Sequence, residues 1–316
     1  MTQRQRARVV FLGMECGFSG PVLRALFAAG VEVAAVVLPA ATPVTERSAN
    51  DERPLRLRPR PGDRTRALPV ALGQPPSVVD LAHARGVPVH EAPTLAGFPV
   101  REKLAEYAPD FIAVACFPVR VPRAVLSLPR HGCLNVHPSL LPRHRGPAPL
   151  FWTFRHDDRS TGVSVYLMNE RLDAGDVIRQ RAIEVPDGST GAELDLRCAA
   201  LGGELLVTAI QDLMDGTARR VPQDEALSTY ESWPDEADFV VDSSWPARHA
   251  FNFVRAAPYW GQPVVAVGDQ RFPVLAALRY DPAPTLDRPY LQHGDVLHMR
   301  CSPGILRVRV PAGQNG

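Results

Sequence analysis

Short apolar runs and amphipathic stretches alternate along the first two thirds of the chain, and this pattern predicts an α/β fold. Continuous apolar runs that end at glycine or proline are typical of strands buried on both faces. The order strand, glycine-rich turn, helix, strand is a βαβ unit, so we expect an open, mostly parallel, Rossmann-like sheet. The predicted strands are residues 8–13, 31–38, 87–90, 110–116 and 132–136, and the predicted helices are 21–29, 78–85, 100–107 and 194–213.

The pattern changes after residue 214, where a polar, proline-containing stretch begins. Short strand-like runs follow at 264–267, 272–279 and 305–310, with one helical stretch at 247–257. Gly and Pro turns separate these runs, as in small all-β domains. We therefore predict a catalytic domain over residues 1–214, a linker over 215–235 and a C-terminal domain over 236–316.

Residues 39–76 interrupt the α/β pattern with a segment rich in proline and arginine. Residues 46–66 alone hold seven arginines against four acidic residues. This composition is typical of a solvated insertion. An arm that contacts RNA is the alternative, because arginine pairs with phosphates and stacks on bases.

Composition restricts the compartment and the partners of the protein but does not indicate its reaction. The formal net charge is +1, which neither demands nor excludes a nucleic-acid partner. The five cysteines are odd in number and lack a C-x-x-C spacing, as expected of free thiols in a reducing compartment. The first apolar run is too brief for a signal peptide, and no run reaches the length of a membrane span. We expect a cytoplasmic protein with no membrane or DNA partner.

Residues 133–149 gather more chemically active side chains than any other stretch of the chain. Asn135 and His137 are two residues apart, so on an extended backbone they point to the same side. An amide donor and a titratable ring that face one cavity suit carbonyl chemistry: the amide polarises the oxygen, and the ring handles a proton. The prolines that follow predict a long but stiff loop.

A second polar segment follows at residues 161–176. Residues 161–168 alternate like a strand and lead into a glycine-containing turn that carries Asp173 and Asp176. A carboxylate beside His137 would fix its tautomer and favour its protonated form. We assign this role to Asp173 and interpret Asp176 as a turn residue.

Several of these motifs, taken together, resemble the folate-dependent formyltransferase superfamily. The resemblance is closest, across the whole chain, to the methionyl-tRNA formyltransferases. It implies a catalytic set of Asn135, His137 and Asp173, a C-terminal β-barrel (OB-like) domain and 10-formyltetrahydrofolate as co-substrate, without a metal. The motifs are Asn135-x-His137, Ser139-Leu-Leu-Pro142, Arg145-Gly146, Thr161-Gly162 and Leu172-Asp-Ala-Gly-Asp176, with Asp173 lying 36 residues (173 − 137) after His137.

The resemblance also suggests where the folate lies. Residues 118–122 align with a segment whose backbone holds the pterin ring in relatives, and Phe117 and Val121 are the candidate contacts. Arg145 either holds a carboxylate or braces the loop. The residues expected to shape the formyl pocket are Ser139, Leu140, Leu141 and Pro142.

The predicted reaction is attack of a neutral primary amine on the formyl carbon. Asn135 would donate to the oxyanion, His137 would relay the proton or stabilise the oxyanion, and Asp173 would orient the ring. Initiator methionyl-tRNA is the leading acceptor, although residues 233–316 hold eight arginines and eight acidic residues, without the basic excess expected of a tRNA-binding domain. A small-molecule amine, such as an amino sugar, and water, in a hydrolase, are the alternatives.

Three further interpretations use the same residues. Cys133 beside His137 could act as a nucleophile, but its place in the middle of a strand favours packing. A binding module without catalysis is the non-enzyme alternative. A metal site is the third, although its candidate ligands lack a compact spacing: His131, His137, His144 and Asp173.

Overall fold

The computed structural model describes residues 6–40, 55–58, 77–283 and 286–312. Of the predicted insertion at 39–76, all but residues 39–40 and 55–58 lies outside these ranges. Within the described ranges, no helix is both long enough and apolar enough to cross a membrane.

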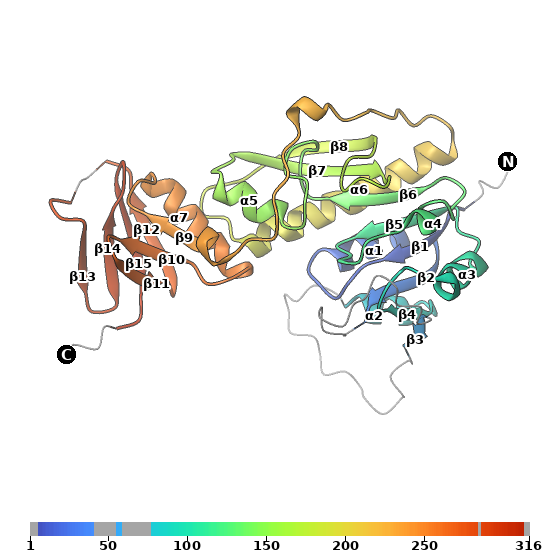
Figure 1. Cartoon of the computed structure of the whole chain (residues 1–316), viewed down its shortest axis with the longest axis horizontal. Helices are drawn as coiled ribbons and strands as arrows, with labels where there is room; N and C mark the ends of the chain where they lie inside the picture. Colours follow the sequence, from blue (N-terminus) through green and yellow to red (C-terminus); the bar gives the residue numbers. More distant parts are fainter. Residues whose placement is uncertain (1–5, 41–54, 59–76, 284–285, 313–316) are drawn as a thin grey trace. The chain divides into compact units, whose positions relative to one another are not determined.

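An eight-stranded sheet organises the N-terminal part of the chain, in the order β3-β4-β2-β1-β5-β6-β7-β8 (Figure 1). The pairs β1–β2, β1–β5, β2–β4 and β5–β6 are parallel, whereas β3–β4 and β6–β7 are antiparallel. The strands are β1 (Arg8–Leu12), β2 (Glu32–Pro39), β3 (Arg56–Leu57), β4 (Val89–Ala92), β5 (Phe111–Ala115), β6 (Cys133–His137), β7 (Ser160–Leu167) and β8 (Val177–Glu184).

Helices join most of the parallel strands, as the βαβ order predicts. β5 is buried at every position, as expected of a strand covered on both faces. The helices here are α1 (Ser19–Ala28), α2 (Val78–His83), α3 (Phe98–Glu106), α4 (Arg123–Leu126), α6 (Gly191–Met214) and the 3₁₀ turn η2 (Glu225–Leu227).

Two adjacent glycines let α6 approach the sheet closely. A Cβ atom on Gly202 would lie 2.5 Å from Val136 Cγ1 on β6, and one on Gly203 would lie 2.6 Å from Ala25 Cβ on α1. Any side chain at either position would push the helix away. This close packing supports β6, the strand that carries Asn135 and His137.

The C-terminal part is built from two small sheets and short helices. One sheet has the order β11-β10-β9 and the other β12-β15-β14-β13. The predicted α/β fold, with a mostly parallel sheet followed by short C-terminal strands, is confirmed. The elements are η3 (Glu236–Phe239), β9 (Val240–Asp242), α7 (Ala247–Ala256), η4 (Ala257–Tyr259), β10 (Val264–Val267), β11 (Gln270–Pro273), β12 (Ala276–Asp281), β13 (Tyr290–His293), β14 (Val296–Arg300) and β15 (Ile305–Arg309). The remaining helix, α5 (Pro149–Arg155), lies between β6 and β7 in the chain.

The chain divides into two compact units. The first comprises residues 1–145, 162–181 and 196–229, and the second comprises 146–161, 182–195 and 230–316. The predicted domain boundaries, 1–214, 215–235 and 236–316, stay a prediction.

Sequence patterns missed some elements. β8 exposes four consecutive residues, so it lacks the apolar run of a buried strand. The strands β13 and β14 join through the two-residue turn Gly294-Asp295, a hairpin signal that the mixed polarity of the flanking residues obscured. The loop predicted from its prolines ends in α5, which begins at Pro149 because proline is accepted in the first turn of a helix.

Candidate functional site

β6 places Asn135 and His137 on one side of the sheet, as the spacing predicts. The strand pairs with β5 on one side and with β7 on the other. The side chain of His137 is buried and that of Asn135 is partly exposed. Across the β6–β7 ladder, Asn135 faces Tyr166 and His137 faces Ser164. Side chains directly opposite in a ladder share a face of the sheet, so these four form one polar cluster.

The turn between β7 and β8 brings Asp173 to this cluster. The Oδ2 atom of Asp173 lies 3.9 Å from Nδ1 of His137, and both side chains are only 6% exposed. Asp173 has φ +49°, a left-handed conformation that aspartate tolerates better than most residues. At Gly175 a Cβ atom would lie 1.7 Å from the carbonyl oxygen of Leu167, so only glycine lets the turn close against β7.

A backbone carbonyl fixes the tautomer of His137. The Nε2–H group donates to the carbonyl oxygen of His144 at 2.8 Å. Because a carbonyl can only accept, Nε2 carries a proton and Nδ1 is the basic nitrogen of the neutral ring. Nδ1 faces the carboxylate of Asp173 at a distance that is too long for a hydrogen bond but allows a charge interaction when the ring is protonated.

Tyr166 and Ser164 are members of the cluster that the sequence analysis did not identify, and Tyr166 contacts the candidate residues directly. Its hydroxyl accepts from Asn135 Nδ2 at 3.0 Å and donates to Asp173 Oδ1 at 2.7 Å. Burial and the nearby Asp173 carboxylate raise the pKa of Tyr166 well above its usual value. Its place in the alternating run of residues 161–168 is typical of a core aromatic residue. Only the register of β7 against β6 identifies its partner.

The loop of Ser139, Leu140, Leu141 and Pro142 is held tightly to β7. Ser164 Oγ donates to the Ser139 carbonyl at 2.6 Å and accepts from the Leu141 amide at 3.1 Å. The Ser139 side chain is fully buried, and its hydroxyl donates to the carbonyl of Arg143. Leu140 packs on β7 because Gly162 leaves it room: a Cβ atom there would lie 2.4 Å from Leu140 Cδ2.

Arg145 braces the site through a network of hydrogen bonds. Its side chain, 7% exposed, binds both carboxylate oxygens of Glu225 at 3.0 and 3.1 Å, and also the side-chain oxygen of Gln223. Hydrogen bonds from Arg145 and, next, from Arg171 lower the pKa of Glu225 to about 2. Gln223 Nε2 in turn donates to the carbonyl oxygens of Asp173 and Gly175, each at 2.8 Å. Arg145 is thus linked to the turn that carries Asp173.

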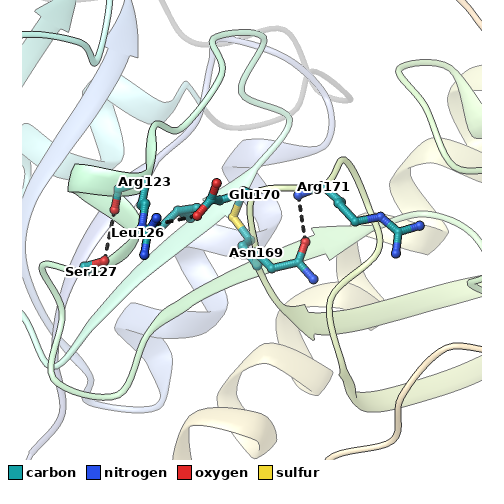
Figure 2. A pocket seen from close by; sticks show the side chains of 7 residues that line it. Arg123, Leu126, Ser127, Asn169, Glu170 and Arg171 are labelled. Carbon is teal, nitrogen blue, oxygen red and sulfur yellow. Dashed lines mark hydrogen bonds and ion pairs between the residues drawn. The ribbon is translucent and has the colours of Figure 1, made fainter.

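A surface pocket of about 440 Å³ lies beside the turn (Figure 2). An ion pair between Arg123 and Glu170, 3.3 Å long, crosses it. The candidates Asn135, His137 and Asp173 are not part of its wall, although Arg171 lies two residues before Asp173. The lining residues are Arg123, Leu126, Ser127, Met168, Asn169, Glu170 and Arg171.

The other predicted folate contacts lie just before this pocket in sequence. Val121 is buried in the core beside β5, and Phe117 packs against the same core while staying partly exposed. Both side chains therefore contribute to packing, and their contact with folate stays a prediction.

Cys133 is a packed thiol. It is 1% exposed, and burial raises the pKa of its thiol to about 12. The thiolate form that nucleophilic catalysis requires is therefore strongly disfavoured near neutral pH.

Comparison with known proteins gives a consistent result. Residues 71–210 match the family model described as formyl transferase. The methionyl-tRNA formyltransferase of Moorella thermoacetica is 33% identical over 276 residues, which are 87% of this chain and 81% of that protein. The enzyme of the same name from Aromatoleum aromaticum is 34% identical over 249 residues, or 79% of this chain and 71% of that protein.

A solved structure shares the fold. The crystal structure of WlaRD, a sugar 3N-formyl transferase, superposes with a TM-score of 0.64 and 11% identity, and the match covers 99% of each chain. The sequence relatives, together with the family model, decide the assignment: the chain belongs to the formyl transferase family.

Proposed function

We propose that the protein transfers the formyl group of 10-formyltetrahydrofolate to the amino group of initiator methionyl-tRNA. One observation carries the chemistry: Asn135, His137 and Asp173 come from two separate segments and meet in one polar cluster. The names of the relatives from M. thermoacetica and A. aromaticum support the acceptor.

His137 acts as the base in this proposal. Its Nε2–H is committed to the His144 carbonyl, so Nδ1 takes the proton that the amine loses on attack. The resulting imidazolium is stabilised by the Asp173 carboxylate, 3.9 Å from Nδ1. When the tetrahedral intermediate collapses, the bond between the formyl carbon and N10 of the folate breaks, and the imidazolium gives its proton to N10, so that tetrahydrofolate leaves. Both side chains are nearly buried, which strengthens this charge interaction relative to bulk water.

Asn135 serves as the donor to the oxyanion. One of its amide protons is used by Tyr166, and the second is the donor assigned to the developing negative charge. Removal of a comparable oxyanion-hole donor costs roughly 3–4 kcal/mol of transition-state stabilisation.

We place the folate beside residues 117–122 and the pocket of Figure 2. Backbone groups of residues 118–122 can pair with the polar edge of a flat heterocycle, with Phe117 and Val121 behind them. The rigid loop of Ser139, Leu140, Leu141 and Pro142 would shape the formyl pocket. No metal enters this scheme, and the cytoplasm is the proposed place of action.

The test of this function is transfer of formyl from 10-formyltetrahydrofolate to charged initiator tRNA. Formylmethionyl-tRNA should accumulate at least ten times faster than formate is released without an acceptor. This ratio of rates corresponds to a difference of about 1.4 kcal/mol in activation free energy. Transfer to a dTDP-amino sugar but not to tRNA would show that the acceptor is an amino sugar rather than initiator methionyl-tRNA. Formate release that no acceptor accelerates would indicate a hydrolase instead.

A further inference from the structure

One hydroxyl group joins two members of the proposed catalytic set. Asn135 Nδ2 donates to the oxygen of Tyr166 at 3.0 Å, and the same hydroxyl donates its proton to Asp173 Oδ1 at 2.7 Å. The direction of this chain is fixed because the Asn135 NH₂ group can only donate and a carboxylate can only accept. The residues come from β6, β7 and the turn after β7, respectively.

We propose that Tyr166 is a positioning residue for formyl transfer, holding the amide of Asn135 and the carboxylate of Asp173 in their working orientations through one hydroxyl. This inference rests on the proposed function. Tyr166 does not need to touch the substrate, since its side chain is only 2% exposed and its hydroxyl already uses both its proton and an acceptor site.

The orientation of each partner depends on this hydroxyl. The two ends of an asparagine amide differ only in hydrogen bonding, so a fixed acceptor decides that Nδ2, rather than Oδ1, points toward Tyr166. The hydroxyl also anchors Oδ1 of Asp173, which leaves Oδ2 as the oxygen that faces His137 Nδ1. Without it, both groups gain rotational freedom that the transition state must remove.

The geometry of the strands explains why a tyrosine can do this. Asn135 and Tyr166 are direct partners in the β6–β7 ladder, so their side chains share a face of the sheet. Tyr166 is among the largest fully buried side chains of the described residues, and its ring fixes the hydroxyl by packing alone. A phenylalanine would fill the same space and lack only the hydroxyl.

The experiment compares Tyr166→Phe with the matched variant Tyr259→Phe. Tyr259 also donates to an aspartate, Asp195 Oδ2, at 3.0 Å, so this control removes the same kind of bond elsewhere. For Tyr166→Phe we expect kcat to fall roughly 10- to 100-fold, the worth of a hydrogen bond to a charged group, with KM for both substrates within about threefold. Tyr259→Phe should keep kcat within about threefold of wild type.

The balance between kcat and KM separates positioning from a general loss of structure. A positioning defect lowers kcat and leaves KM for both substrates within about threefold. A Tyr166→Phe enzyme in which KM rises as much as kcat falls would contradict the positioning role.

A readout without turnover keeps the inference separate from the proposed function. The side-chain amide NMR signals of Asn135, assigned by their loss in Asn135→Ala, should shift in Tyr166→Phe and stay unchanged in Tyr259→Phe. Unshifted signals, or a wild-type kcat, would overturn the positioning role. If the wild-type protein transfers no formyl to any amine while the signals still shift, the proposed function fails and the hydrogen-bonded chain stands.

Discussion

A glutamine side chain, Gln223, helps to hold the turn that carries Asp173. Gln223 Nε2 donates to the carbonyls of Asp173 and Gly175 at 2.8 Å, and its oxygen accepts from the Arg145 guanidinium at 2.8 and 3.2 Å. We predict that Gln223→Ala loosens this turn and slows formyl transfer, although Gln223 lies outside the proposed catalytic set.

The size of the effect follows from these bonds. Each bond to a neutral carbonyl contributes about 1 kcal/mol net, and the bonds to the guanidinium contribute somewhat more. The loss of the bonds between Gln223 and Arg145 is partly offset because the Arg145 guanidinium still binds Glu225. The free energy of unfolding should therefore fall by about 2–4 kcal/mol. If half of the lower figure is lost from the transition state, the rate falls about fivefold.

The assay measures single-turnover transfer and denaturant unfolding for Gln223→Ala and for a control, Gln262→Ala. Gln262 Nε2 also bridges two carbonyls, those of Pro263 and Val274, at 3.1 and 2.7 Å. The control should lose stability and keep its rate. A Gln223→Ala enzyme that is as fast as wild type, or a control that slows equally, would refute the reasoning.

Three further predictions concern the same structure. Gly175→Ala should abolish transfer and lower the melting temperature, since a Cβ atom would meet the backbone of β7 at 1.7 Å; thermal unfolding beside a rate assay checks this. A hydrogen bond from Cys116 is the main cause that lowers the pKa of Cys16 to about 6, so iodoacetamide should label Cys16 at a rate that rises through pH 6. In the native protein Cys133, whose pKa is raised to about 12, should stay unlabelled at pH 7, as checked by mass spectrometry. Arg145 and, next, Arg171 lower the pKa of Glu225 to about 2, so these ion pairs stabilise the fold above pH 4.5 and lose this effect as the pH falls toward 2. Glu225→Gln should flatten the profile of stability against pH across that window, and an unchanged profile would contradict this.

The parts of the fold that sequence predicted are those with local signals. The buried parallel strands β1, β2 and β5 contain continuous apolar runs, so they could be located from the sequence. The common orientation of Asn135 and His137 follows from the two-residue period of a strand. β8 has no such signal because most of its residues are exposed.

The parts of the site that sequence missed depend on tertiary neighbours. Tyr166 has a polar role only because β7 pairs with β6 in one register. Gln223 and Glu225 lie in a stretch that reads as a polar linker, and nothing local shows that they bind Arg145. His144 acts through its backbone carbonyl, so its side-chain identity gives no sign of the contact with His137.

The measurement that tests the central claim most directly is single-turnover formyl transfer by His137→Ala, with His131→Ala as the matched control. His131 stacks on Phe111, 5.2 Å between ring centroids, and has no role in the proposed chemistry. Loss of the general base should slow His137→Ala by about 10²–10⁴-fold, while His131→Ala stays near the wild-type rate. A folded His137→Ala enzyme that transfers formyl within about threefold of wild type, less than 1 kcal/mol of barrier, would contradict the account.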